Sequence, residues 1–216
     1  MKASVLLRKL QIDGKEFVTS PELKEYCKKG KFDYDTVVKN LERSKHLTRI
    51  FRGIFYVRSP EEIILEKCKY DHLELVAKGL EIKGVTNWYF GLYTALQLNN
   101  MTHEYFVVDD ILNDTIFRQK PMSIANRKYN FKKISKPLLG FGIKKLGIVN
   151  YSDPEKTILD FIYLWKFNGR SDLRITGDIY DWTNNISRTK IKKYSKHYPK
   201  SVKKIVEALE IEKGTD

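Results

Sequence analysis

The fold is decided by one stretch, residues 17–59, which has the sequence FVTSPELKEYCKKGKFDYDTVVKNLERSKHLTRIFRGIFYVRS. It begins with a helix signal, because the Thr19 or Ser20 hydroxyl can cap free backbone N–H groups and Pro21 suits a first helical turn. Apolar residues follow at helical spacing, and Gly30 ends the segment. A second helix is expected over residues 34–46, with Asp33 as its cap.

Two short β-rich runs follow this helix pair. Residues 47–51 (LTRIF) and 54–57 (IFYV) flank Arg52 and Gly53, and a two-residue turn containing glycine between such runs is typical of a β-hairpin. A further helix is expected near the start of the chain, over residues 1–10. Helix, helix-turn-helix and hairpin in this order predict a winged helix.

The second helix of the pair carries side chains suited to DNA. Its apolar residues lie on one side, and Thr36, Lys39, Asn40 and Arg43 recur at three- and four-residue steps on the opposite side. Arg and Asn hydrogen-bond to guanine and adenine in the major groove, and Lys contacts phosphate. An ordinary solvated helix face is the alternative, but the hairpin arginines favour DNA, since they can reach the flanking backbone or minor groove. The predicted DNA-binding residues are Tyr34, Thr36, Lys39, Asn40, Arg43, Arg49 and Arg52.

Charge is distributed unevenly along the 216 residues. The formal net charge of +13 points to a polyanionic partner. Residues 1–58 hold 14 Lys and Arg against 7 Asp and Glu, whereas residues 59–167 hold 15 against 13. Residues 168–216 hold 11 against 7, so the near-neutral middle is expected to do something other than grip phosphates. We expect two domains: a DNA-binding winged helix over residues 1–59, and an α/β domain over residues 60–216 that ends in basic helices.

The larger domain is expected to be a mixed α/β domain with helices around a small sheet, which makes the chain α+β overall. Ser59 and Pro60 open a helical region that extends to about Leu80, either as one helix or with a break near Tyr70 and Asp71. Another helix is expected over residues 89–99, and one begins at Asp153. The expected strands are residues 104–109, 115–118, 129–134 and 145–149.

The C-terminal part contains a run of basic residues without acids. Two helices split by Pro199 fit this segment best. A solvated helix pair and a supplementary nucleic-acid or partner surface are both consistent with the pattern. The residues of that possible secondary surface are Arg188, Lys190, Lys192, Lys193 and Lys196.

Signals for an enzyme, a metal or a membrane are weak. Gly140 and Gly142 lack the further residues of a nucleotide-binding loop, and the four histidines have no metal-ligand spacing. No apolar run approaches the ~20 residues needed to span a bilayer, and the N-terminus has too short an apolar core for a signal peptide. We expect a cytoplasmic protein without cofactor or catalytic activity. The rival is a metal-dependent nuclease using Asp109, Asp110, Glu155 and Lys156.

Three segments together resemble the AbiEi-type antitoxin family of abortive-infection, type IV toxin–antitoxin systems. They are residues 47–57 (LTRIFRGIFYV), 88–96 (WYFGLYTAL) and 153–160 (DPEKTILD), in the order and at the spacing of the family. The resemblance covers most of the first 165 residues and is poor beyond Trp165.

The resemblance implies an N-terminal winged helix that represses the protein's own operon and a C-terminal α/β domain required for antitoxicity. It also implies a functional partner, a nucleotidyltransferase-like toxin, that is counteracted without a tight stable complex. The expected function is therefore a DNA-binding antitoxin and autorepressor acting on double-stranded operator DNA. A winged-helix regulator with a ligand- or protein-binding C-terminal domain and no toxin is the alternative. The sequence leaves the oligomeric state open.

Overall fold

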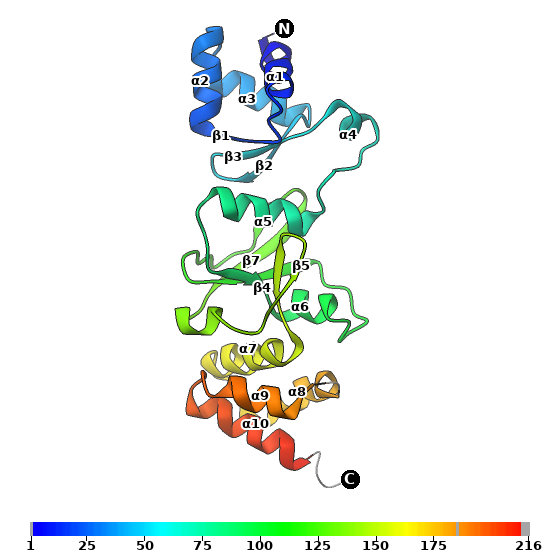
Figure 1. Ribbon diagram of the computed structural model, residues 1–216, viewed down its shortest axis with the longest axis vertical. Helices are drawn as coiled ribbons and strands as arrows, with labels where there is room; N and C mark the ends of the chain where they lie inside the picture. The colour runs from blue at the N-terminus through cyan, green and yellow to red at the C-terminus, as the bar shows by residue number, and fades with distance from the viewer. Residues whose placement is uncertain (1, 185, 213–216) are drawn as a thin grey trace. The chain divides into compact units, whose positions relative to one another are not determined.

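The computed structural model describes residues 2–184 and 186–212, which form two compact units (Figure 1). Both units combine helices with a β-sheet, which confirms the predicted α+β class. The first unit runs to Thr86 and includes Ser123–Arg127, and the second comprises the rest. The first unit thus extends beyond the Ser59–Pro60 boundary expected from the sequence.

The first unit begins with three helices whose ends are fixed by local capping. Thr19 and Glu22 form a reciprocal capping box at the start of α2, in which the Glu22 carboxylate accepts the Thr19 N–H at 2.8 Å. The Asp33 carboxylate accepts the Thr36 N–H at 2.8 Å and so begins α3. The helices and strands of this part are α1 (Lys2–Ile12), β1 (Phe17–Thr19), α2 (Ser20–Gly30), α3 (Tyr34–Arg43), β2 (Leu47–Phe51) and β3 (Ile54–Val57).

The three strands form an antiparallel sheet of order β1-β3-β2, and both of its faces are covered. One face packs against α1, α2 and α3, where Leu10, Leu41 and Phe55 are among the buried core residues. The other face packs against α5 (His72–Ile82), which follows the short helix α4 (Pro60–Ile64). Figure 1 shows the sheet between the three helices and α5. The burial of every residue of β3 follows from this double cover.

The second unit contains most of a sheet with both parallel and antiparallel pairs, while residues 123–127, in β6 and at the start of β7, are grouped with the first unit. The order of this sheet is β6-β7-β5-β4-β9-β8; β5 pairs with β7 in parallel and β4 pairs with β5 antiparallel. The strands are β4 (Trp88–Phe90), β5 (Val108–Asn113), β6 (Met122–Ile124), β7 (Arg127–Lys133), β8 (Ile143–Leu146) and β9 (Val149–Ser152).

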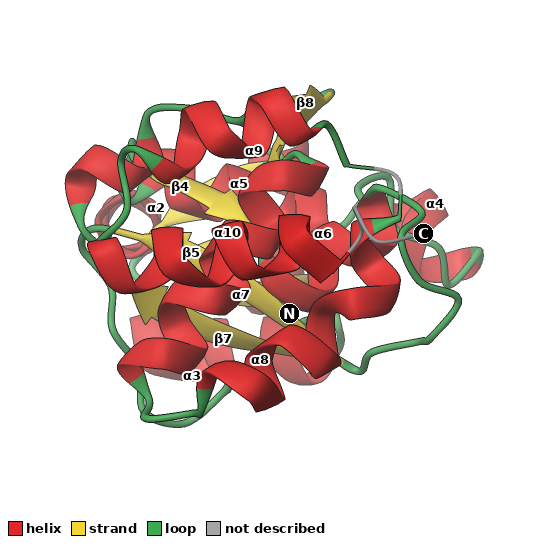
Figure 2. Cartoon of the chain, turned by 90° about the horizontal axis from the view of Figure 1, so that it is seen from below, coloured by secondary structure: helices red, strands yellow, loops and turns green. Residues whose placement is uncertain are grey.

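Helix α7 is the centre of the second unit. Its buried residues Ile158, Leu159 and Ile162 belong to a core shared with α6 and with the C-terminal helices. Figure 2 views the chain from below, with these helices in front of strands β4 and β5. The helices are α6 (Leu92–Leu98), η1 (Lys136–Leu139), α7 (Pro154–Phe167), α8 (Asp172–Ile179), η2 (Tyr180–Thr183), α9 (Arg188–Ser195) and α10 (Lys200–Glu212).

Several expected elements of the second unit are wrong in position or type. Residues 88–99 form strand β4 and helix α6 joined at Gly91, instead of one helix. The strand expected at 104–109 begins only at Val108, and residues 115–118 form no strand. The segment around 145–149 is a hairpin, because Gly147 (φ +58°) turns β8 back onto β9.

The capped helices, the hairpin of β2 and β3, and the helix pair separated by Pro199 are confirmed. Among the residues that the structure describes, no helix is both long and apolar enough to cross a membrane.

Candidate nucleic-acid interface

Helix α3 has one buried and one exposed side, as its periodicity predicts. Val37, Val38 and Leu41 are buried in the core of the first unit. Thr36, Lys39 and Arg43 are all exposed and recur at steps of three and four residues. These three side chains therefore form one outward-facing ridge, which we call the α3 ridge.

The two remaining α3 candidates have contacts within the unit. The Asn40 side chain is half-buried, and its Oδ1 accepts a hydrogen bond from Nη2 of Arg43 at 3.3 Å. The Tyr34 hydroxyl lies 2.8 Å from the Ser20 hydroxyl at the start of α2, and Nζ of Lys24 lies 5.5 Å from the centre of its ring. Asn40 thus orients Arg43, while Tyr34 joins α2 to α3.

The two hairpin arginines differ in their surroundings. Nε and Nη2 of Arg49 donate to the Glu42 carboxylate at 2.9 and 3.0 Å, and the guanidinium lies 4.9 Å from the centre of the Phe55 ring. This bidentate pair joins β2 to the end of α3 and raises the pKa of Arg49. Arg52 is exposed at the turn. Arg49 is therefore a neutralised support for α3, and Arg52 remains at the hairpin tip.

The hairpin turn is fixed to the start of α2. Gly53 has φ +77°, a conformation that favours glycine, and its carbonyl accepts the Ser20 N–H at 2.8 Å. The turn consists only of Arg52 and Gly53, so the hairpin has a short tip. Arg52 is thus held next to the N-terminus of α2.

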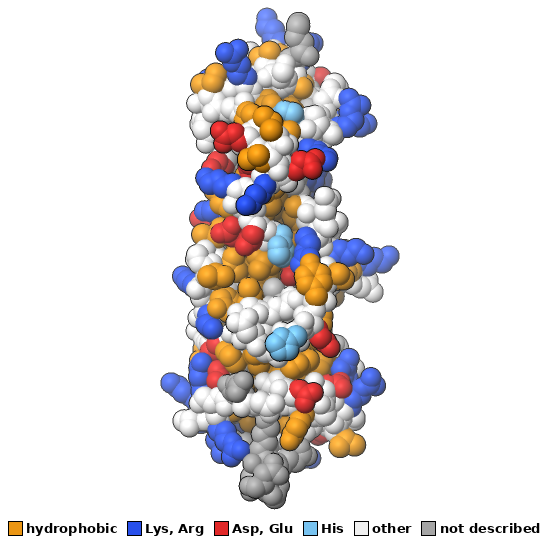
Figure 3. Space-filling model, turned by 90° about the vertical axis from the view of Figure 1, so that its right-hand side faces the viewer, with side chains coloured by type: hydrophobic (Ala, Val, Ile, Leu, Met, Phe, Trp, Pro, Cys, Tyr) orange, Lys and Arg blue, Asp and Glu red, His pale blue; other side chains and the backbone are white. Residues whose placement is uncertain are grey.

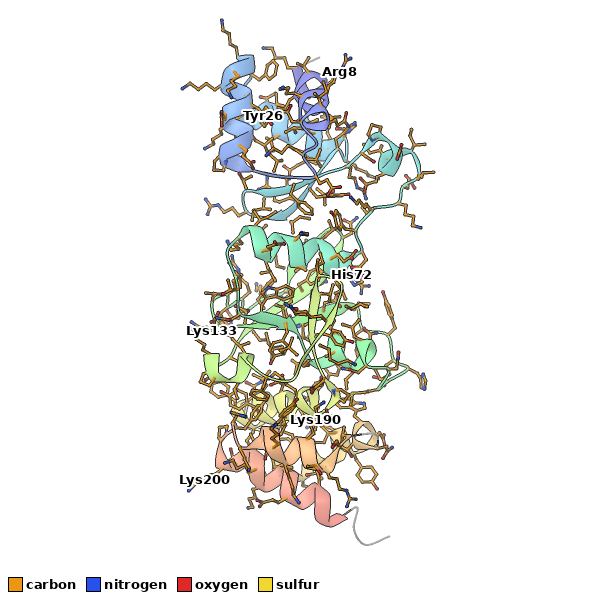
Figure 4. All side chains as sticks on the ribbon, viewed as in Figure 1. Arg8, Tyr26, His72, Lys133, Lys190 and Lys200 are labelled. Atoms are coloured by element: carbon orange, nitrogen blue, oxygen red, sulfur yellow. The ribbon has the colours of Figure 1, made fainter. Side chains whose placement is uncertain are left out.

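The five candidates of the C-terminal basic run differ in exposure and in their partners. Nζ of Lys190 lies 3.0 Å from Oδ2 of Asp153 and 2.9 Å from Oε2 of Glu155, and Figure 4 places it between α7 and α9. Partial burial acts to lower the pKa of Lys190, but the two carboxylates raise it. Lys190 therefore holds α9 onto the start of α7. The other four candidates, Arg188, Lys192, Lys193 and Lys196, are exposed.

Basic residues are not gathered into a single patch on the face shown in Figure 3, where they alternate with acidic and apolar side chains.

The four residues of the nuclease alternative have separate partners. Asp109 accepts a hydrogen bond from the Thr94 hydroxyl at 3.3 Å, and Asp110 accepts one from Nδ2 of Asn130 at 3.0 Å. Glu155 accepts the Ser187 N–H at 2.9 Å and pairs with Lys190. Among the described residues, no group of three or more His, Cys, Asp or Glu side chains has an arrangement that could hold a metal ion.

Lys156, the fourth of them, is fully buried. Its Nζ lies 2.6 Å from the Leu138 carbonyl, 3.4 Å from Oδ1 of Asp160 and 3.2 Å from the Tyr198 hydroxyl. Tyr89 and Tyr198 each donate to Asp160 at 2.6 Å. Burial lowers the pKa of Lys156, and Asp160 opposes this. Residues 153–160 (DPEKTILD) therefore connect the first half of α7 to the surrounding elements through buried polar contacts.

The complete network could not be predicted from the sequence, since its members lie as far apart as Tyr89 and Tyr198. Only the contact between Lys156 and Asp160 has a local indication, which is their i, i+4 spacing.

No protein-family model matches the chain, and no curated protein matches it. Among solved structures, the chain is similar to the RV2827C protein from Mycobacterium tuberculosis, with a TM-score of 0.60 and 15% sequence identity. The similarity covers 96% of this chain and 75% of that one. At this identity it shows a shared fold and nothing about activity.

Proposed function

We propose that the protein is a DNA-binding regulator whose first unit is a winged helix that inserts α3 into the major groove. The observation that carries the proposal is the α3 ridge, formed by Thr36, Lys39 and Arg43. The ridge lies on the third helix of a helix-strand-helix-helix-strand-strand unit with sheet order β1-β3-β2. A helix of this width fits the major groove, and Arg is the side chain that most often reads guanine there.

The contacts of the remaining candidates assign them supporting roles. Arg49 keeps Glu42 neutralised, which removes an acidic charge from the edge of the proposed interface. Arg52 at the hairpin tip is positioned to contact the backbone flanking the groove. Asn40 holds Arg43, so the loss of Asn40 would weaken binding through Arg43.

The antitoxin part of the proposal rests on the three segments that resemble the AbiEi-type family. We propose accordingly that the protein represses its own operon in the cytoplasm and that its second unit counteracts a nucleotidyltransferase-like toxin. Residues 153–160 enter this proposal as a structural signature of the family, and their Asp153 and Glu155 pair with Lys190 of α9.

The proposal is tested by measuring the binding of the full chain to the DNA upstream of its own gene. Arg43→Ala should cost about 1–3 kcal/mol and relax base preference at one position. Lys39→Ala should weaken binding to all sequences alike, as expected for a phosphate contact. Equal affinity of wild type and both variants for this DNA would contradict the assignment.

The toxin role is tested separately by co-expression with the neighbouring downstream gene. Rescue of growth by the full chain, retained when Lys39 and Arg43 are both replaced by alanine, would support an antitoxin whose second unit acts without DNA. Failure of the wild-type chain to rescue growth would leave the alternative regulator, whose second unit binds a ligand or protein. A cavity in the second unit supports the ligand-binding form of that alternative.

A further inference from the structure

The second unit contains a cavity of about 500 Å³ beside α7. Its walls come from the first turn of α6, the C-terminal half of α7, strands β5 and β7, and the segment that leads into β5. This volume lies in the range of small-molecule sites, which are usually apolar with a few polar groups.

Aromatic side chains form one part of the lining. The ring centroids of Tyr93 and Phe106 are 4.5 Å apart, those of Tyr93 and Phe161 are 4.9 Å apart, and those of Phe161 and Trp165 are also 4.9 Å apart. The planes of these neighbouring rings are tilted by 39°, 73° and 53°, so they form an extended aromatic wall and not one flat surface. The extent of this wall suits a bicyclic planar group, because aromatic side chains stack on nucleobases.

A polar floor lies on the sheet. Asp110 and Asn130 are partners in the parallel pair of β5 and β7, so both side chains lie on the same face. Asp110 is only 3% exposed, and it receives hydrogen bonds from Nδ2 of Asn130 at 3.0 Å and from the Tyr93 backbone. A carboxylate accepts about four hydrogen bonds, so Asp110 has capacity for an N–H donor of a ligand.

Two cations border the same cavity. Nζ of Lys132 lies 3.8 Å from Oδ1 of Asp110. The Arg170 guanidinium lies 4.3 Å from the centre of the Trp165 ring and pairs with Asp178 at 3.0 Å. With one acid and two bases, the lining complements an anion that also carries N–H donors.

The backbone at the cavity is strained. Leu92, the first residue of α6 and part of the lining, has φ +51°, a conformation that L residues other than Asn and Asp rarely adopt. Such strain costs about 1–3 kcal/mol and gathers at ligand sites.

From these features we infer that the cavity binds a purine nucleotide. The base lies against the partly exposed rings of Tyr93, Phe106 and Trp165 and donates an N–H to Asp110. The phosphate is held by Lys132 and Arg170. Adenine and guanine both carry N–H groups on their edges, whereas inorganic phosphate offers neither a ring nor a donor edge.

The test is calorimetric titration of the full chain with AMP and GMP, and with CMP, UMP and inorganic phosphate for comparison. We expect saturable 1:1 binding of at least one purine nucleotide, with pyrimidine nucleotides and phosphate weaker by about tenfold or more. Arg170→Ala should weaken binding about tenfold, and Asp110→Asn should do the same. The matched control is Arg174→Ala, since Arg174 also approaches Asp178, at 3.9 Å, but does not line the cavity.

A second readout separates loss of binding from loss of fold. Ligand binding should change tryptophan fluorescence, and Trp165→Phe should remove most of the change while keeping an aromatic wall. Circular dichroism checks that each variant is folded. The absence of saturable binding to either purine nucleotide would overturn the inference. So would affinity that is unchanged in both Arg170→Ala and Asp110→Asn, or phosphate binding as tightly as the nucleotides.

Discussion

Lys156 shows how a charged residue can serve structure alone. Its side chain is 0% exposed, and it is satisfied by Asp160, Tyr198 and a backbone carbonyl. Burial raises the pKa of Tyr89 and Tyr198, and the negative charge of Asp160 adds to this, so both hydroxyls stay protonated donors. A buried pair is costly to break, because one charge is left without its partner.

Replacing Lys156 with methionine should therefore lower the free energy of unfolding by about 3–5 kcal/mol. The double variant Lys156→Met/Asp160→Asn should lose less, because no unpaired charge remains. Urea unfolding followed by tryptophan fluorescence measures the second unit, since Trp88, Trp165 and Trp182 all belong to it. Lys145→Met, at an exposed position, is the control and should change stability by less than about 0.5 kcal/mol. A loss below that size in Lys156→Met would refute a structural role.

Asp110 makes the stability of the second unit depend on pH. Burial raises the pKa of its carboxyl from 3.8 to about 6, although Lys132 and Asn130 act to lower it. Between these two values the folded state holds a proton that the unfolded state has released. The free energy of unfolding therefore falls as pH rises from about 4 to about 6, by on the order of 3 kcal/mol.

Asp110→Asn should remove this dependence, so the variant should gain stability relative to wild type as pH increases from 4 to 7. Urea unfolding at several pH values, again followed by tryptophan fluorescence, measures the difference. A stability difference that stays constant over this range would show that Asp110 titrates near its ordinary value.

At the scale of elements, α5 covers the face of the small sheet that is turned away from α1, α2 and α3. Gly79 allows the close approach, because an added Cβ would lie 2.6 Å from Cγ2 of Ile50 and 2.7 Å from Cε2 of Phe51. Alanine is the better helix former by about 1 kcal/mol, so local propensity and packing oppose each other here.

Gly79→Ala should destabilise the first unit by about 1–3 kcal/mol, because overpacking outweighs the gain in helix propensity. Gly177 in α8 is the matched control, since an added Cβ there meets nothing within 4 Å, and Gly177→Ala should stabilise by about 0.5–1 kcal/mol. Urea unfolding followed by far-ultraviolet circular dichroism compares the two. If Gly79→Ala were as stabilising as Gly177→Ala, α5 would not pack on the sheet as described.

The elements that could be predicted from the sequence are those with local signals. Thr19 and Asp33 cap their helices through neighbours three residues away, and Gly53 marks the hairpin turn. Strand β5 was placed too early because Tyr105 and Val107 are apolar, although they are 71% and 66% exposed. The burial of Asp110 could not be predicted, since its partner Asn130 comes from a different strand.

The residues of the candidate interface could likewise be predicted only where the signal is local. The α3 ridge follows from helical period alone and could be predicted. The Arg49–Glu42 pair and the contacts of Lys190 with α7 could not, because they depend on how separate elements pack. Tertiary structure thus gives Arg49 and Lys190 ion-pair partners within the protein, and their predicted part in binding stays a prediction.

For the whole molecule, the structure and the charge distribution favour a division of labour. The first unit carries the α3 ridge, and its N-terminal residues 1–58 hold 14 Lys and Arg against 7 Asp and Glu. The second carries an aromatic cavity and a rigid joint between α7 and the C-terminal helices. The proposed function assigns DNA binding to the first unit, and the inferred nucleotide site adds ligand binding to the second.

The proposed function requires that α3 binds the protein's own promoter. The most direct measurement is the affinity of the full chain for that DNA over a series of salt concentrations, by fluorescence anisotropy. The double variant Lys39→Ala/Arg43→Ala should bind at least tenfold more weakly, and the slope of log K against log salt should decrease by up to about 2. Lys133→Ala/Lys145→Ala removes the same charge from exposed positions in the second unit and should behave as wild type. Wild-type affinity and salt slope in the α3 double variant would contradict the claim.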